Sequence, residues 1–146
     1  MRCFLALKIP EDISGKLYFN SEGNLKKVDK EKLHLTLHFW KDKNPDEIIK
    51  ALDRFYFEPF KVKLDKITLF PPKKPRTIAA MVKENDELRE LHKMIMEKTG
   101  LKTRRFKPHI TLARIKQLDY FEERYIDIEF EVDRIYLVGS TLTYEG

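Results

Sequence analysis

The sequence predicts an α+β fold in which antiparallel strands are packed by helices on one side. Three observations lead to this prediction: strand and helix patterns follow one another in a mixed order, several strands show clear alternation, and a proline-rich connection indicates a hairpin. The predicted order is strand, helix, strand, helix, two strands, helix, and two or more strands. A doubly wound parallel sheet would need regular alternation instead. The 146 residues have the size of one domain and contain no linker, so we expect a single domain over residues 1–146.

The first part of the chain predicts two strands joined by a short helix and a loop. Residues 3–9 form the first strand, and Pro10 with the acidic residues after it begins a helical segment towards Tyr18. Residues 21–24 are predicted as loop. Residues 33–40 are predicted as a strand whose two faces differ in chemistry. One face carries Leu33, Leu35, Leu37 and Phe39, and the other carries His34, Thr36, His38 and Trp40.

The middle of the chain predicts a helix and then a hairpin. Asn44 can cap a helix that has a proline at its first position and ends near Phe55. Residues 60–70 and 77–82 have strand patterns. Because the PPKKPR segment between them cannot lie inside a sheet, we expect a hairpin with an exposed basic loop.

The last part predicts a helix followed by strands. Asn85 can cap the helix, and Gly100 stands just past its expected end. Residues 109–115 form the next strand. Residues 126–143 alternate strongly enough to be one long strand or two short ones, with a possible bend at Gly139 and Ser140.

Composition excludes a disordered chain and argues against a membrane partner. Apolar residues make up 42% of the chain, but their longest runs are too short to span a bilayer. Cys3 is the only cysteine, which excludes an internal disulfide or a cysteine-based zinc site and favours a reducing cytoplasm. The net charge of +5 favours anionic partners if it gathers on one face. We expect a cytoplasmic monomer.

A short motif of His, an apolar residue, Thr and Leu occurs twice, at residues 34–37 and 109–112. On a strand, residues i and i+2 share a face, so each motif places an imidazole beside a hydroxyl. If the two strands meet, the pair of imidazoles flanks a phosphate-sized space with the hydroxyls between them. Histidine, with an ordinary pKa near ~6.5, can act there as acid in one copy and as base in the other.

The other two histidines are assigned structural roles. His92 falls at helical spacing with apolar neighbours, which indicates a core or boundary position. Alternation places His38 on the face of His34, at the edge of the groove, but a bystander role is favoured. A metal site is disfavoured because His34 and His38 would lie roughly 13 Å apart on a strand, and a site of His34 and His109 lacks evident carboxylate ligands.

Five segments together resemble one enzyme family. They are RCFLALKIP, KEKLHLTLHFW, FPPKKPRTIAAMV, RRFKPHITLAR and VGSTLTYEG, and they span nearly the whole chain, with the two motifs 75 residues apart. In these segments the chain resembles the 2H phosphoesterase superfamily, and within it the LigT-like RNA 2′,3′-cyclic phosphodiesterases. The first motif departs from the family in continuing Phe-Trp-Lys where the family usually has Phe-Leu-Gly.

The resemblance implies a fold, an activity and a set of residues. The fold would have two pseudo-symmetric lobes, with antiparallel sheets around a central cleft and helices on the outside. The activity would be metal-independent and cofactor-free opening of 2′,3′-cyclic phosphates at RNA or oligonucleotide ends, leaving a 2′-phosphate. His34 and His109 would be the catalytic pair, Thr36 and Thr111 would bind phosphate oxygens, and Arg114 would be a further phosphate ligand.

Alternation and resemblance disagree about Arg114. Strict alternation places it on the face of Ile110 and Leu112, so it reaches the groove only if the strand ends or bulges near Ala113. Candidate RNA-capturing residues lie in two basic loops; they are Lys73, Lys74, Arg76, Lys102, Arg104, Arg105 and Lys107.

Three alternative functions stay open. Within the enzyme class they are 2′-5′ RNA ligation, which is the reverse chemistry, and hydrolysis of a small cyclic nucleotide. From a different class, the alternative is an RNA-binding module without efficient turnover. The intact histidine pair argues against that module, because binding alone does not require two imidazoles.

Overall fold

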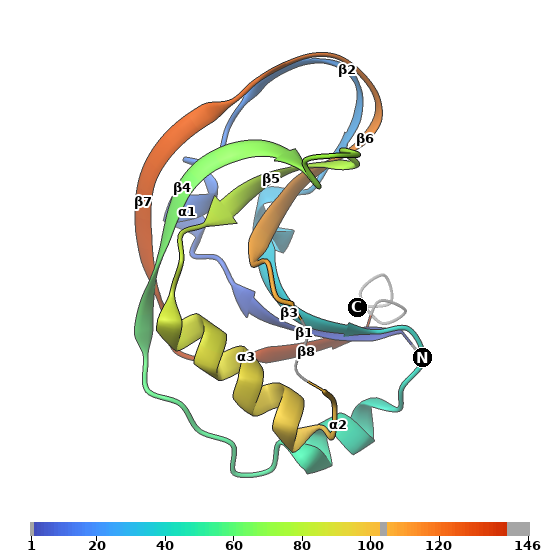
Figure 1. Cartoon of the computed structure of the whole chain (residues 1–146), viewed down its shortest axis with the longest axis vertical. Helices are drawn as coiled ribbons and strands as arrows, with labels where there is room; N and C mark the ends of the chain where they lie inside the picture. Colours follow the sequence, from blue (N-terminus) through green and yellow to red (C-terminus); the bar gives the residue numbers. More distant parts are fainter. Residues whose placement is uncertain (1, 103–104, 140–146) are drawn as a thin grey trace.

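The structure is a computed structural model that describes residues 2–102 and 105–139. Within these residues, eight strands form one curved sheet in the order β7-β4-β5-β6-β3-β1-β8, and β2 pairs with β6 beside this path (Figure 1). The strands are β1 (Cys3–Lys8), β2 (Asn20–Lys27), β3 (His34–Trp40), β4 (Phe60–Phe70), β5 (Thr77–Val82), β6 (His109–Glu122), β7 (Arg124–Val132) and β8 (Tyr136–Gly139). The helices are α1 (Glu11–Ser14), α2 (Pro45–Ala51) and α3 (Asp86–Lys98), with a 3-10 turn η1 at Lys30–Lys32.

Every strand pairing in this part of the chain is antiparallel, so the predicted α+β class with antiparallel strands is confirmed. The expected separate sheets are joined into one. Their junction lies between β3 and β6, where Leu35 pairs with Ile110. The two motif strands are therefore neighbours at the middle of the sheet.

The two longer helices begin at the predicted caps. The Asn44 side chain accepts a hydrogen bond from a backbone amide in the first turn of α2, and Asn85 does the same for α3. α2 ends at Ala51, about one turn before the predicted Phe55. Gly100 follows α3 with a φ of 74°, the left-handed conformation in which glycine commonly ends helices.

The central hairpin of β4 and β5 has the bounds that the sequence predicts. β4 alternates up to a register shift after Leu64, with Val62 and Leu64 buried before the shift and Ile67 after it, whereas Ile78, Ala79 and Ala80 of β5 are buried in succession. The proline-rich loop between the strands is largely exposed, because prolines lack the amide hydrogens that a sheet interior needs.

Residues 21–24 were predicted as loop, and that prediction is wrong: they lie in β2. This strand pairs with the far part of β6, which continues to Glu122 instead of ending near Ile115. The sequence of β2 is polar and exposed on both faces, so it carries no alternation, and its strand conformation depends on pairing with β6. Gly23, at φ 140°, passes so close to the backbone of Gln117 that a Cβ there would collide with its carbonyl oxygen.

The alternating stretch near the C-terminus forms two strands, β7 and β8, separated by residues 133–135. The predicted strand residues 140–143, and the Ser140 side of the possible bend, lie outside the described residues. β7 pairs with β4 and β8 pairs with β1, so these two strands are the edge strands at opposite ends of the strand order.

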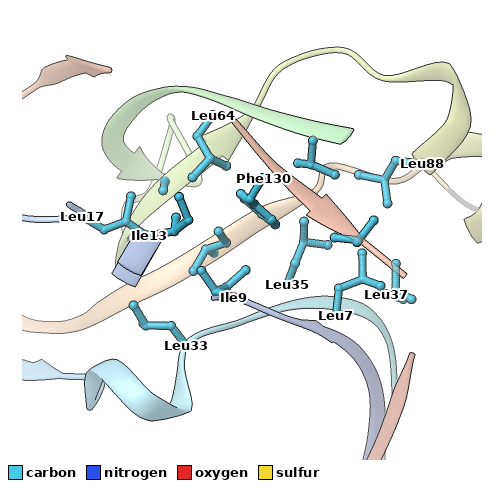
Figure 2. Close-up of a cluster of buried hydrophobic side chains, with 14 of the residues drawn as sticks. Leu7, Ile9, Ile13, Leu17, Leu33, Leu35, Leu37, Leu64, Leu88 and Phe130 are labelled. Carbon is cyan, nitrogen blue, oxygen red and sulfur yellow. The ribbon is translucent and has the colours of Figure 1, made fainter. Parts of the chain in front are cut away.

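One hydrophobic core lies against a single face of the sheet. All three helices contribute to it, with Ile13 from α1, Ile48 from α2 and Leu88 from α3. Figure 2 shows Leu7, Leu35 and Leu64 of three strands in the same cluster as Leu88. The other face of the sheet carries both polar and aromatic side chains, among them His34 with Phe4 and His109 with Phe70. No helix among the described residues is long and apolar enough to cross a membrane.

Candidate active site

The four motif side chains lie on one face of the sheet. Leu35 and Ile110 are paired across the two strands and are both fully buried in the core. Because neighbours along a strand point to opposite faces, the histidine and threonine on either side of each buried residue project away from the core. We call this surface the motif face; its motif residues are His34, Thr36, His109 and Thr111.

The antiparallel pairing determines which motif residues are neighbours. With Leu35 opposite Ile110, His34 lies on the side of Thr111 and Thr36 on the side of His109. The four motif residues thus form a quadrilateral in which the two imidazoles occupy one diagonal and the two hydroxyls the other. The sequence predicts only that both hydroxyls lie between the imidazoles. Each imidazole has the hydroxyl of the other motif across from it.

A β-bulge in β6 turns Arg114 towards the motif face. The pairing of β5 with β6 skips Leu112, and consequently Leu112 and Ala113 are both buried in succession. After the bulge the alternation is inverted, and Arg114 is exposed.

The register of β5 gives the same result independently. Residues opposite one another in an antiparallel pair share a face. The partners of His109, Thr111 and Arg114 on β5 are Met81, Ala79 and Thr77. These three alternate without interruption on one face of β5, so Arg114 shares the face of the second-motif histidine and threonine. Strict alternation along β6, which assigned Arg114 to the opposite face, is wrong at the bulge.

The first motif has a bulge at the corresponding leucine. The pairing of β1 with β3 skips Leu37, and His38 then lies opposite the buried Leu5. His38 is therefore on the core side, and the alternation that placed it on the face of His34 is wrong because of this bulge. Phe39 takes the motif face instead, opposite Phe4, and 44% of its surface is exposed. The sequence pattern assigned Phe39 to the apolar face and so missed it.

Phe39 and Arg114 are equivalent positions, each five residues past its histidine. An equivalent bulge in each strand brings these two residues to the motif face. One of them presents an aromatic ring and the other a guanidinium. The equal spacing of five residues from each histidine is visible in the sequence. It predicts that Phe39 shares the motif face only if a bulge is known to follow each motif.

Each motif histidine is held in the same way. The Nδ1 atom of His34 lies 2.9 Å from the carbonyl oxygen of Lys32, and Nδ1 of His109 lies 2.8 Å from that of Lys107. A carbonyl oxygen can only accept, so Nδ1 carries hydrogen in both rings. The other nitrogen, Nε2, is then the one without hydrogen in a neutral ring, and it is available to accept a proton.

An aromatic ring supports each imidazole. Phe4 stacks on His34 with ring centroids 4.8 Å apart, and Phe70 packs on His109 at 4.3 Å. Phe4 comes from the strand next to β3, whereas Phe70 comes from β4 and reaches across β5. The intervening Ala79 is small and fully buried, which leaves room for this contact.

Local sequence positions the two carbonyls. The turn η1 ends at Lys32, two residues before His34, and Pro108 stands between Lys107 and His109. A proline disfavours helical conformation in the preceding residue and therefore holds Lys107 extended. Both carbonyl groups thus precede the strand at the same offset.

His92 lies on the core side, as its spacing predicts. It is 4% exposed and stacks on Phe106 with ring centroids 4.0 Å apart. Burial lowers the pKa of His92, and the charge of His38 lowers it further. The four histidines therefore divide into two on the motif face and two behind the sheet.

The predicted basic residues are exposed wherever the structure describes them. They are Lys73, Lys74, Arg76, Lys102, Arg105 and Lys107, whereas Arg104 lies outside the described residues. Among residues 2–102 and 105–139, no three His, Cys, Asp or Glu side chains are grouped so that they could hold a metal ion.

Comparison with known proteins identifies the family. The family model of the 2′-5′ RNA ligase superfamily matches residues 16–142. The chain belongs to the 2′-5′ RNA ligase superfamily. The resemblance seen in the sequence to the 2H phosphoesterases is thereby confirmed.

Individual proteins and solved structures match the chain over nearly its full length. An RNA 2′,3′-cyclic phosphodiesterase of Methanocaldococcus jannaschii is 33% identical over 165 residues, covering 100% of this chain and 95% of the relative. A crystal structure of TT0787 from Thermus thermophilus superposes with a TM-score of 0.74 at 25% identity, over 94% and 87% of the two chains.

The LigT fold is also matched. The crystal structure of E. coli LigT complexed with 3′-AMP superposes with a TM-score of 0.71 at 22% identity, over 93% of this chain and 86% of LigT. The predicted LigT-like fold is confirmed.

Proposed function

We propose that the protein is a metal-independent RNA 2′,3′-cyclic phosphodiesterase that opens a terminal cyclic phosphate to a 2′-phosphate. The main support is the pair of imidazoles on one face of the sheet. In each of them a backbone carbonyl holds Nδ1, and Nε2 is left for proton transfer. The activity named for the full-length archaeal relative supports the proposal.

The reaction needs one proton removed and one supplied. A neutral imidazole accepts a proton at Nε2 from water as the water oxygen attacks phosphorus. The bond from phosphorus to O3′ breaks, and the second imidazole, charged at the start, donates its Nε2 proton to O3′. One water is consumed, and the product is a 2′-phosphate monoester with a free 3′-hydroxyl. His34 and His109 fill these two roles.

The neighbouring side chains suit the non-bridging oxygens of the phosphate. Thr36 and Thr111 donate from the corners between the imidazoles, and the planar guanidinium of Arg114 can offer two parallel hydrogen bonds. On the other half, the ring of Phe39 is partly exposed, with the guanidinium of Arg2 5.6 Å from its centroid, and it provides a surface on which a nucleobase can stack. The second motif then neutralises charge while the first receives the base.

The ligase reaction is the second candidate. It joins a cyclic phosphate to a 5′-hydroxyl and uses the same two proton transfers in reverse, so the same face supports it. Membership of the 2′-5′ RNA ligase superfamily favours this candidate. A non-catalytic RNA-binding role leaves the matched carbonyl contacts of the two histidines without a purpose.

The proposal is tested by incubating the protein with 2′,3′-cyclic AMP and with a cyclic-phosphate-ended oligonucleotide, both in excess EDTA. We expect hydrolysis of each substrate to a 2′-phosphate. A 3′-phosphate product would overturn the proposed regiochemistry. A reaction that stops in EDTA and returns with zinc or magnesium would overturn the metal-independent mechanism.

We further propose that the substrate is the end of an RNA or oligonucleotide and that the protein acts as a monomer in the cytoplasm. The excess of basic residues and the single cysteine support these assignments. Size-exclusion chromatography with light scattering tests the monomer.

A further inference from the structure

A groove of about 510 Å³ adjoins the second-motif histidine. A volume of this size is typical of sites for small organic ligands. Its walls are Lys66, Thr68, Leu69, Phe70, Pro72, Met81, Lys107, Phe121 and Glu123. We call it the β4–β6 groove, because β4 and β5 line one side and the end of β6, with the turn after it, lines the other.

The groove continues the motif face. On β4, Lys66, Thr68 and Phe70 lie opposite Met81, Ala79 and Thr77 of β5. Those same residues of β5 lie opposite the second-motif histidine, threonine and arginine on β6. All three strands therefore present these residues on one face. Phe70 contacts His109 directly, and Lys107 both lines the groove and holds His109 through its carbonyl oxygen.

Charge is distributed unevenly along the groove. Lys107 is beside the histidine, and Lys66 lies across two strands from it, in the row of Met81 and His109. At ~4.8 Å per strand spacing, Lys66 is about 10 Å from His109. Glu123 lies near Lys66, which helps to keep the Glu123 carboxylate ionised.

The carboxylate of Glu123 is held in place. The Thr68 hydroxyl donates to it at 2.6 Å, and Thr68 and Tyr125 together lower the pKa of Glu123. A carboxylate repels phosphate but accepts hydrogen bonds from the amino groups of nucleobases. Phe121 is partly buried, with the Phe19 ring 6.3 Å away between centroids, and the part of its ring that lines the groove offers a stacking surface. The groove thus combines two lysines, which suit a phosphodiester, with a carboxylate and an aromatic ring, which suit a base.

We propose that the β4–β6 groove binds the nucleotide that precedes the cyclic-phosphate end of the RNA. Lys66 and Lys107 bind the phosphodiester that links this nucleotide to the terminal one, Phe121 stacks on its base, and Glu123 accepts a hydrogen bond from the base amino group. This inference rests on the proposed function and extends it, because it makes an oligonucleotide a better substrate than a mononucleotide.

The test compares 2′,3′-cyclic AMP with four dinucleotides that end in the same cyclic-phosphate adenosine and differ in the first base. For the unaltered protein we expect kcat/KM to be at least tenfold higher for a dinucleotide with adenine, guanine or cytosine first. Uracil, which has no amino group, should gain less. Equal kcat/KM for mononucleotide and dinucleotides would overturn the inference.

Three substitutions locate the effect. Lys66→Ala should lower the ratio of dinucleotide to mononucleotide kcat/KM roughly tenfold and reduce the salt dependence for dinucleotides by about 0.7 log units per log unit of salt. Phe121→Leu keeps apolar bulk but loses the ring, and should lower the same ratio about fivefold or more. Glu123→Gln should remove the disadvantage of uracil.

Lys61→Ala is the matched control. Lys61 is an exposed lysine on the same strand that pairs with Glu129 and does not line the groove. It should leave the ratio and the salt dependence unchanged. If Lys61→Ala lowers the ratio as much as Lys66→Ala does, general surface charge explains the preference and the inference fails. Melting temperatures of all variants check that each is folded.

Failure of this inference differs from failure of the proposed function. If no cyclic phosphate is hydrolysed, the proposed function itself is wrong. If both substrate classes are hydrolysed and Lys66→Ala leaves their ratio unchanged, the catalytic proposal stands and the groove does not bind the preceding nucleotide.

Discussion

The half of the sheet around β3 and the half around β6 build their motif histidines alike but surround them differently. Both histidines contact a backbone carbonyl through Nδ1, both pack on a phenylalanine, and both are followed by a bulge at leucine. After the bulge, one half presents Phe39 and the other presents Arg114. The setting of the two imidazoles is therefore duplicated, whereas the side chains beside them differ between the halves.

The supporting rings also differ in origin. Phe4 lies on the strand beside β3, but Phe70 reaches over β5 from β4 and so connects His109 to the β4–β6 groove. On the first half, the residue of β1 opposite His34 is Lys8, whose ammonium lies over Tyr136 of β8. The difference teaches that the repeated motif places its two imidazoles alike, while the flanking strands decide which other side chains surround each of them.

The largest expected effect comes from removing either motif histidine. His34→Ala and His109→Ala should each lower kcat by roughly 10²–10⁴, since each removes one proton transfer. The double variant should lose much less than the product of the two, because the histidines act in one step. Steady-state kinetics on 2′,3′-cyclic AMP measure this. Near-normal turnover by either single variant would contradict the mechanism.

The pH dependence of the same variants should show which histidine is the acid and which the base. The unaltered protein should show a bell-shaped dependence of kcat/KM on pH. Residual activity should lose its low-pH limb when the base is removed and its high-pH limb when the acid is removed. The profiles therefore assign acid and base to the two halves, and identical profiles for both variants would contradict separate roles.

The second prediction concerns the two residues after the bulges. Arg114→Lys keeps the charge but loses the planar pair of donors, so kcat/KM should fall about tenfold or more. Because Arg114 is exposed, the melting temperature should change little. Phe39→Leu should instead raise KM for the nucleotide with a smaller effect on kcat. A fall in stability without a fall in rate for Arg114→Lys would show that the guanidinium supports the fold.

The third prediction tests the aromatic supports. Contacts between aromatic rings contribute about 0.5–1.5 kcal/mol beyond burial, so Phe4→Leu and Phe70→Leu should each lower kcat/KM by roughly two- to tenfold. Phe70→Leu should have the larger effect on dinucleotides, because Phe70 also lines the β4–β6 groove. If Phe70→Leu lowers kcat/KM equally for the mononucleotide and the dinucleotides, Phe70 supports His109 and does not contribute to binding in the groove.

The smallest effect concerns His92, behind the sheet. Its pKa in the folded state is lowered by burial, so below about pH 6.5 the unfolded chain takes up a proton more readily than the folded one. Stability should be complete above that pH and decline as the pH falls, by at most about 1.4 kcal/mol per unit. His92→Phe, which can keep the stack on Phe106, should make the decline shallower in urea unfolding. An unchanged slope would contradict this.

Much of the fold follows from local sequence. Asn44 and Asn85 cap helices because their side chains accept hydrogen bonds from amides of the first turn, which needs no distant partner. The first part of β4 alternates because one of its faces is buried, and prolines exclude the connection to β5 from the sheet. The two motifs were recognisable for the same reason, since i and i+2 spacing defines a face on any regular strand.

Other features depend on partners far away in the chain. β2 has a polar sequence without a period, and it became a strand because β6 extends far enough to pair with it. The alternation of the two faces is interrupted at Leu37 and Leu112. These bulges depend on the register with a neighbouring strand, so the hydrophobic pattern of the strand itself does not reveal them. The sequence by itself determined the antiparallel α+β class, the caps, the hairpin and the paired His and Thr residues, because each rests on interactions within one segment. Only the tertiary structure decided that Phe39 and Arg114 reach the motif face and that Phe70 packs on His109, because those positions follow from the registers of strands that are distant in sequence.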